Sequence, residues 1–414
     1  MTSGTDEAGR AAARVARDSY GRLVAFLSAR TRDVAGAEDA LADAFAAALR
    51  SWPRDGVPLN PDAWLLTAAR RRQTDSGRRR QTRVAAEPHL RLMQDEIEDA
   101  AMHAESIPDR RLALMFACAH PAIEHGMRAP LILQTILGLT AADIADAFLI
   151  APSTMGQRLV RAKTRIRDTG IPFRVPEREE LPERLAAVLE AIYAAYTKGW
   201  SEIDESGTPP LADEAIWLAR LVVSLLPEEP EAKGMLALML YAEARRAARR
   251  DEAGGFVPLE AQDTALWDLG LIEAAEALLR DASSGGPAGR YQIEAAIQSA
   301  HTARRLSGAE TWPAIIALYD HLLALTGSPV VVLNRAVALA EIEGPEAALA
   351  AMAALADEPR MQSYQPYWAA RGHLAVRAGR RDEAHEALRL AAGLTTDPAI
   401  RDYLFSRLAA LRDD

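Results

Sequence analysis

The chain has 414 residues, of which 49% are hydrophobic and 26% charged, a composition typical of soluble globular proteins with two or three domains. No stretch of about 18 apolar residues occurs, so we expect no membrane partner. The single cysteine, Cys118, excludes an internal disulfide and fits a reducing cytoplasm. Residues 1–174 carry a net charge of +4 and residues 175–414 one of −14, which together give −10. Nucleic acid would therefore meet the N-terminal part.

Abundant alanine and few β-branched runs predict an all-α chain. We expect residues 1–9 to form a disordered leader and residues 10–30 a first helix. The amphipathic pattern of Ala37–Trp52 predicts a second helix with an apolar inner side. Its outer surface carries three acids, Glu38, Asp39 and Asp43. These acids have a simple structural explanation as well, because carboxylates stabilise the start of a helix.

A proline-rich loop is expected at Pro53–Pro61, followed by a helix from Asp62. The segment Arg70–Arg83 then holds seven arginines and one acid, Asp75. Such a cluster attracts a phosphate backbone and makes binding depend on salt. The alternative is a solvated charged surface without a ligand.

Residues 87–109 are acidic and weakly periodic, and we interpret them as a linker with some helical tendency. Leu112–Ile123 and Pro130–Leu139 are strongly apolar and predict two further helices. Together with the helix pair that follows, these two helices would form a four-helix domain.

The pair lies in Thr140–Arg167, TAADIADAFLIAPSTMGQRLVRAKTRIR. Thr140 and Asp143 can form a capping box, and we expect Ser153 to cap the second helix. That helix has a buried stripe of Met155, Leu159, Ala162 and Ile166. A second stripe, one residue over, holds Thr154, Arg158, Arg161 and Arg165. An apolar back and a cationic front are what a recognition helix needs in a major groove, although a solvated basic helix would show the same pattern.

Helical repeats are predicted in the C-terminal half. The clearest unit is Tyr367–Pro398, in which Trp368, Gly372, Ala384, Leu388 and Ala391 have the spacing of a tetratricopeptide repeat. Gly372 and Ala384 would let the paired helices approach closely. A degenerate unit and further helices are expected at Pro329–Leu355, Ala212–Arg250, Leu266–Leu279, Tyr291–Leu306 and Trp312–Leu325. A repeat domain of this kind offers a concave surface for a peptide or protein ligand.

Sequence patterns of enzymes are absent. The glycine-rich segment Ser283–Arg290 lacks the GK[ST] of a phosphate loop, so a plain loop is expected. His120 and His125 lie near Cys118 without a fourth ligand at metal spacing. We therefore predict no catalytic residue, no metal and no cofactor, and a protein that is not an enzyme.

The order of these segments resembles a known family. The segments look like those of a bacterial RNA polymerase sigma factor. They are, in order, an acidic-faced helix (AEDALADAF), a tryptophan helix that ends in an arginine cluster (PDAWLLTAARRRQTDSGRRR), an acidic linker and the helix pair ending RLVRAKTRIR. The resemblance is to the extracytoplasmic-function subfamily of the sigma-70 family and covers about residues 10–170. It implies region 2 at 10–83, an acidic linker at 84–109 and region 4, a helix-turn-helix, at 110–170. The tetratricopeptide-like domain would span 183–414.

The resemblance also implies roles for single residues. Core RNA polymerase would bind through Asp39 and Asp43. The −10 element of promoter DNA would be bound from the loop Arg54–Asn60 and the following helix, by Arg54, Asn60, Arg70, Arg71, Arg72, Arg78 and Arg79. The −35 element would be read by Thr154, Gln157, Arg158, Arg161 and Arg165. Capture of a flipped base costs a few kcal/mol, which contacts in the loop must offset.

The resulting hypothesis is a cytoplasmic transcription initiation factor that directs core polymerase to specific promoters. Its acidic C-terminal domain would regulate it, one route being an intramolecular contact with the basic sigma domains. Two other functions stay open. One is a helix-turn-helix regulator with a helical sensor domain that needs no polymerase, and the other is a repeat-type adaptor protein.

Overall fold

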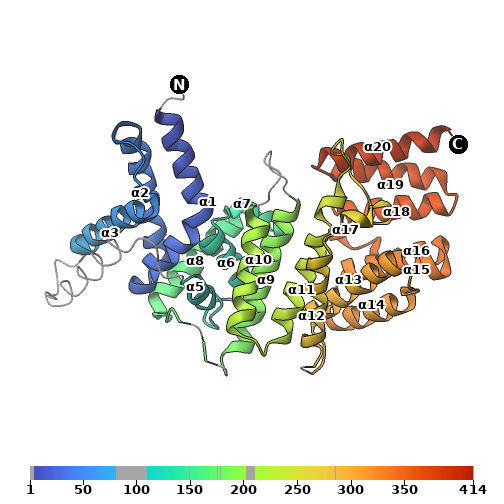
Figure 1. The fold of residues 1–414 in the computed structure, drawn as a ribbon, viewed down its shortest axis with the longest axis horizontal. Coiled ribbons are helices and arrows are strands. Elements are labelled where there is room, and N and C mark those ends of the chain that lie inside the picture. The colour runs from blue at the N-terminus through green and yellow to red at the C-terminus, as the bar shows by residue number, and fades with distance from the viewer. Residues whose placement is uncertain are drawn as a thin grey trace. The chain divides into compact units, whose positions relative to one another are not determined.

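The computed structural model describes residues 4–80, 110–148, 150–174, 176–177, 179–201, 210–284 and 286–413. Every named secondary-structure element in these residues is a helix (Figure 1), which confirms the predicted all-α fold. One isolated antiparallel bridge joins Arg250 and Phe256. Within the described ranges no helix is both long and apolar enough to cross a membrane. The chain divides into two compact units, Met1–Leu218 and Ala219–Asp414.

The first unit is built around α1. Its helices are α1 (Gly4–Thr31), α2 (Val34–Asp55), α3 (Pro61–Arg80), α5 (Arg111–Cys118), α6 (His125–Leu137), α7 (Ala141–Ala147), α8 (Pro152–Thr169), α9 (Leu181–Ser201) and the start of α10 (Pro210–Leu225). Helix α1 packs against α2, α3, α5 and α6. At Gly21 a Cβ atom would lie only 1.8 Å from the carbonyl oxygen of Ile136, so this approach of α1 to α6 requires glycine.

Two predictions near the N-terminus were wrong. Residues 4–9, expected in a disordered leader, are helical, because Ala8 is fully buried and extends the apolar side of α1. The expected loop from Pro53 begins later, at Gly56. Proline in the last turn of α2 removes only one hydrogen bond, and Gly56, at φ +83°, donates its N–H to the Trp52 carbonyl and ends the helix.

Boundaries also differ in the next part of the unit. Helix α5 ends at Cys118, five residues before the predicted Ile123, and α6 begins at His125 rather than at Pro130. Pro130 lies inside α6 and is buried. Since the apolar residues continue through both segments, their pattern predicted the helices but not their ends.

Helix α9 belongs to the first unit, although we assigned residues from 183 onward to the C-terminal domain. It packs against α5 and α6. The buried Arg128 of α6 donates hydrogen bonds to the Ile123 carbonyl and, at 3.1 Å, to the Glu183 carboxylate. Arg111 of α5, also buried, pairs with Glu214 and lies 4.1 Å from the ring centre of Trp217. Two buried guanidinium groups thus join α5 and α6 to the segment that follows them.

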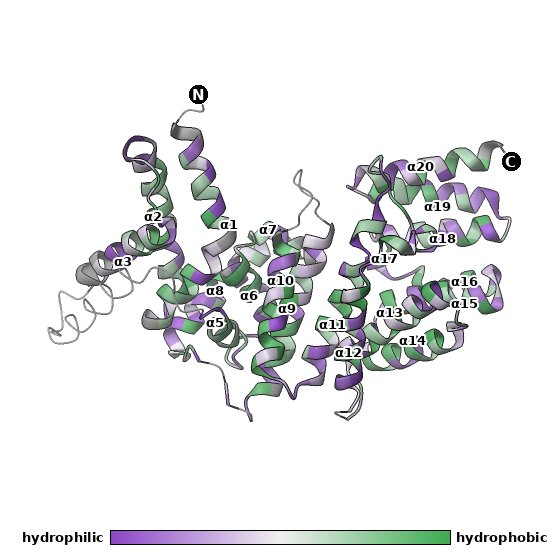
Figure 2. Cartoon of the chain, viewed as in Figure 1, coloured by the Kyte–Doolittle hydropathy of each residue, from purple (hydrophilic) through white to green (hydrophobic). Residues whose placement is uncertain are grey.

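The second unit is a succession of helices in which neighbours in the chain are neighbours in space. After the end of α10 its elements are α11 (Pro230–Ala244), η1 (Arg246–Arg249), η2 (Leu259–Ala261), η3 (Thr264–Leu266), α12 (Leu269–Ala282), α13 (Arg290–Ser307), α14 (Trp312–Thr326), α15 (Pro329–Glu343), α16 (Pro345–Met352), η4 (Ala353–Leu355), α17 (Pro359–Gln362), α18 (Gln365–Arg377), α19 (Arg381–Leu394) and α20 (Pro398–Asp413). From α13 to α16, and again from α18 to α20, each helix packs on the next. Figure 2 shows hydrophobic and hydrophilic residues alternating along these helices.

Helices α18 and α19 form the pair predicted at Tyr367–Pro398. Tyr367, Leu388 and Ala391 are buried, as the spacing required. A Cβ on Gly372 would lie 2.7 Å from Leu388 Cγ, closer than side-chain carbons pack. The predicted need for a small residue at this crossing is confirmed.

Candidate nucleic-acid interface

The first helix of the α7–α8 pair begins with the capping box that the sequence predicted. The Asp143 N–H donates to the Thr140 hydroxyl at 3.2 Å, and the Thr140 N–H donates to the Asp143 carboxylate at 3.1 Å. This reciprocal capping box is confirmed. The hydrogen bond with the Thr140 hydroxyl contributes most to a lowered pKa of Asp143, which keeps the carboxylate ionised.

The start of α8 differs from the prediction. Ala151 is the capping residue and Pro152 the first helical residue, so Ser153 lies inside the first turn. Proline suits this position because its missing N–H would have no partner in the helix and its fixed φ matches the helix. Helix α8 therefore begins two residues earlier than expected.

Three faces of α8 have different environments. The apolar stripe of Met155, Leu159, Ala162 and Ile166 is buried, as predicted. The predicted reading residues lie on a neighbouring face: Gln157, Arg161 and Arg165 are exposed, and Thr154 and Arg158 are half-buried. The fold thus brings all five residues to one side of a single helix, where they can approach a groove together.

A shallow, open depression borders this face of α8 and is lined by Ser153, Gly156, Gln157, Val160 and Arg161. Val160 is 64% exposed, which is unusual for a valine on a packed helix. An apolar side chain among polar ones can contact the methyl group of thymine. Val160 is not among the predicted reading residues, although the sequence places it one turn beyond Gly156 and beside Arg161.

Two further cationic side chains of α8 form ion pairs with acidic residues of the protein. Lys163 forms an ion pair with Glu38 of α2, in which the side chains are 11% and 15% exposed. Burial is the main cause of a raised pKa of Glu38, and Lys163 opposes that shift. Arg167 pairs with Asp168 at 3.3 Å. Of the five cationic side chains of α8, only Arg158, Arg161 and Arg165 belong to the predicted reading face.

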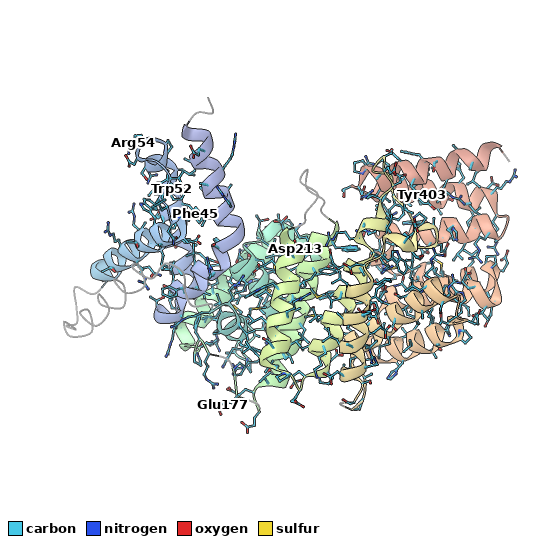
Figure 3. The ribbon with its side chains drawn as sticks, in the orientation of Figure 1. Phe45, Trp52, Arg54, Glu177, Asp213 and Tyr403 are labelled. Carbon is cyan, nitrogen blue, oxygen red and sulfur yellow. The ribbon has the colours of Figure 1, made fainter. Side chains whose placement is uncertain are left out.

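Helices α2 and α3 hold the second candidate surface. Trp52, 2% exposed, meets Trp64 edge to face with ring centres 5.5 Å apart, which fixes the two helices around their loop. Trp52 and Arg54 lie in the part of α2 that leads into this loop (Figure 3), and Arg54 is exposed. Asn60 accepts a hydrogen bond from the Ala63 N–H and so caps α3.

Leu59, next to Asn60, is fully exposed at 108% of the reference area. It is the most exposed large hydrophobic residue of the described chain. An exposed apolar side chain of this kind can contact the face of a nucleobase. The sequence offered a signal in the unusual position of Leu59 between Pro58 and Asn60, which we did not use.

The arginines of α3 are not equivalent. Arg71 and Arg72 are exposed, whereas Arg70 stacks over Phe26 of α1 with 4.8 Å between its guanidinium carbon and the ring centre. Arg70 therefore has a packing role within the unit, and its role in DNA binding stays a prediction. Arg78 and Arg79 lie on α3, but their side chains, like the predicted linker at 84–109, fall outside the described residues.

The predicted polymerase-binding acids are both exposed on α2, beside the exposed Ala42. Asp43 lies 3.9 Å from Arg72, and both side chains are more than half exposed. A pair this open to solvent contributes little to stability. Asp39 and Asp43 are thus accessible to another protein.

Metal and thiol chemistry have little support in this unit. No group of three His, Cys, Asp or Glu residues among the described ones could hold a metal ion. Cys118 is fully buried, and burial raises the pKa of its thiol to about 12. A thiol in this state is inert.

Two family models and one relative match the chain. Residues 15–83 match the family model described as sigma-70 region 2. Residues 184–283 match a family described as of unknown function, DUF6596. An uncharacterized protein of Rhizobium meliloti (strain 1021) is 39% identical over 379 residues, which cover 90% of this chain and 89% of that protein. No solved structure matches the chain.

Proposed function

Since the chain belongs to the sigma-70 family through the region 2 match at residues 15–83, we propose that it is an initiation factor of the extracytoplasmic-function type. It binds core RNA polymerase and recognises promoter DNA. In this proposal region 2 comprises residues 10–83 and contacts the −10 element. Residues 110–170 form region 4, a helix-turn-helix that reads the −35 element.

The observation that carries the second part is the face of α8. Three arginines, Arg158, Arg161 and Arg165, share one side of the helix with Gln157 and Thr154 while the apolar stripe is buried behind them. Arginine can form two hydrogen bonds with the edge of a guanine, or one with each of two phosphates. Glutamine can form two hydrogen bonds with the edge of an adenine. The short first helix and the turn before α8 favour entry of the N-terminal end of α8 into the groove.

The loop of region 2 supports melting of the promoter. Arg54 and Leu59 are exposed at either end of a turn held by the Trp52–Trp64 contact and the Asn60 cap. We propose that this loop receives an unstacked base of the −10 element while Arg71, Arg72, Arg78 and Arg79 hold the strand. Arg70 assists from its stacked position over Phe26.

Asp39 and Asp43 form the proposed contact with polymerase. Both residues are exposed, and Asp43 stays open to solvent although Arg72 lies 3.9 Å away, so both carboxylates are accessible to a basic surface. Because polymerase would hold the two DNA-binding regions at a fixed separation, each can bind weakly and still contribute through effective concentration.

The C-terminal helices are proposed as a tetratricopeptide-like regulatory domain in the cytoplasm. Successive packing from α13 to α16 and from α18 to α20 supports a repeat architecture. Such a domain could bind a peptide or protein, or act through the sigma domains of the same chain.

The test is transcription from genomic DNA by core polymerase with and without the protein, with start sites mapped by sequencing. We expect new start sites that share upstream elements and disappear in the double variant Arg158→Ala, Arg161→Ala. Arg167→Ala, on the same helix but paired with Asp168, is the matched control and should keep them. Equal transcription with and without the protein contradicts the proposal, and DNA binding without polymerase at the same sites would favour an independent regulator.

To test regulation by the C-terminal domain, the chain must be shortened without removing helices of the first unit. A cut at residue 174 would remove α9 and with it Glu183, the partner of the buried Arg128. We therefore place the end after Glu228, in the turn between α10 and α11. If transcription from the mapped promoters is unchanged in this shortened protein, the domain does not regulate it.

A further inference from the structure

A small, partly open pocket lies within the second unit, far along the chain from the proposed DNA-binding helices. It is lined by His301, Arg304 and Arg305 of α13, Trp312 and Tyr319 of α14 and Asn334 of α15. Leu259 and Glu260 of η2 and Val337 and Ala338 of α15 complete the lining, and the volume of the pocket is about 170 Å³. That volume equals roughly six water molecules in the liquid, which is room for one planar ring with a small substituent.

The aromatic walls of the pocket are fixed by their own contacts. His301 meets Trp312 edge to face, with ring centres 5.5 Å apart and planes at 83°. Burial, with help from Arg245 and Arg304, lowers the pKa of His301 to about 4, so this ring is neutral near pH 7. A neutral imidazole, an indole and a phenol offer ring faces and edges to an aromatic ligand.

Two guanidinium groups set the charge of the pocket. Arg304 stacks over Trp312, with its guanidinium carbon 4.5 Å from the ring centre. Arg305 donates to the Gln262 carbonyl at 2.8 Å, and its Nε is buried with no hydrogen-bond partner among the described residues. Glu260 is the one carboxylate of the lining. Two guanidinium groups against one carboxylate leave the lining with a net positive charge, which favours an anionic ligand.

We propose that this pocket binds a small aromatic carboxylate. The ring lies against Trp312 and Tyr319, and the carboxylate faces Arg304 and Arg305, whose planar donors match its two oxygens. Glu260 repels the carboxylate and so orients the ligand toward the arginines.

The pocket is coupled to the irregular segment between α11 and α12. Arg305 holds the carbonyl of Gln262, which is 6% exposed, and η2 supplies the pocket wall at Glu260. A ligand that draws Arg305 toward its carboxylate competes with this hydrogen bond. Binding would therefore change the hydrogen bonding of residues 259–262.

The test uses 4-fluorobenzoate and the full chain, followed by fluorine NMR, and does not depend on the proposed function in transcription. We expect a saturable shift for 4-fluorobenzoate and at least tenfold weaker binding of 4-fluorobenzamide, which has the same shape without the charge. Arg304→Gln should weaken 4-fluorobenzoate at least tenfold. Arg389→Gln, the same change at an exposed position of α19, should leave the affinity unaltered.

A second variant keeps the test decisive if Arg304→Gln disturbs folding. Val337→Phe introduces a ring from a residue of the pocket lining without a change in charge and should abolish the shift. The proposal is overturned by equal binding of the two probes, by an unchanged affinity in Val337→Phe, or by no saturable shift at all.

Discussion

The salt dependence of DNA binding gives a quantitative test of the three faces of α8. Each cation that displaces counterions from duplex DNA adds about −0.9 to the slope of log K against log salt concentration. The structure assigns three arginines to the reading face, Arg158, Arg161 and Arg165. Helix α8 should therefore contribute a slope of about −2.7 if all three meet phosphates.

Arg161→Ala removes one of these charges at an exposed position. We expect the slope to become shallower by about 0.9 if Arg161 contacts a phosphate. If Arg161 reads a base instead, binding to that promoter should weaken by about 1 to 3 kcal/mol with relaxed preference at one position. The measurement is fluorescence anisotropy of a labelled promoter fragment with core polymerase and the protein, between about 50 and 200 mM salt.

Arg167→Ala and Lys163→Met are the controls on the same helix. Arg167 is paired with Asp168, and Lys163 is buried against Glu38. Neither should change the slope, although Lys163→Met should lower the stability of the first unit because it leaves the buried Glu38 carboxylate without its cation. The reasoning is refuted if Arg167→Ala alters the slope as much as Arg161→Ala, since then helix position would not decide which cations meet DNA.

Three other predictions concern separate parts of the chain. Leu59→Ser should leave thermal stability unchanged, because the side chain is fully exposed, yet slow promoter opening, which permanganate footprinting of unpaired thymines measures. Gly372→Ala should destabilise the second unit by about 1 kcal/mol in urea unfolding, because overpacking against Leu388 outweighs the gain in helix propensity. Gly393 has open space around it, so Gly393→Ala should stabilise the same unit by about 0.5–1 kcal/mol. The lowered pKa of His301 means that the unfolded state binds a proton more readily than the folded state. Stability should therefore fall as pH decreases from about 6.5 to about 4, and His301→Gln should remove that part of the pH dependence in unfolding curves.

The sequence alone determined the features that depend on local periodicity and on chemical type. The buried stripe of α8, the capping box of Thr140 and Asp143, and the small residue at Gly372 follow from spacings of three, four and seven residues along a helix. The all-α fold follows from the same patterns repeated along the chain. The cationic stripe was visible because helical geometry alone decides which residues share a face.

Only the tertiary structure decided which of these side chains remain accessible. Lys163 and Arg161 are both cations of α8, and the sequence could not show that one faces Glu38 of α2, more than a hundred residues away. Likewise Arg70 stacks on Phe26 of another helix, and α9 covers α6 through Arg128 and Glu183. The physical reason is that burial and pairing are long-range contacts between helices, whereas a periodic pattern describes one helix at a time.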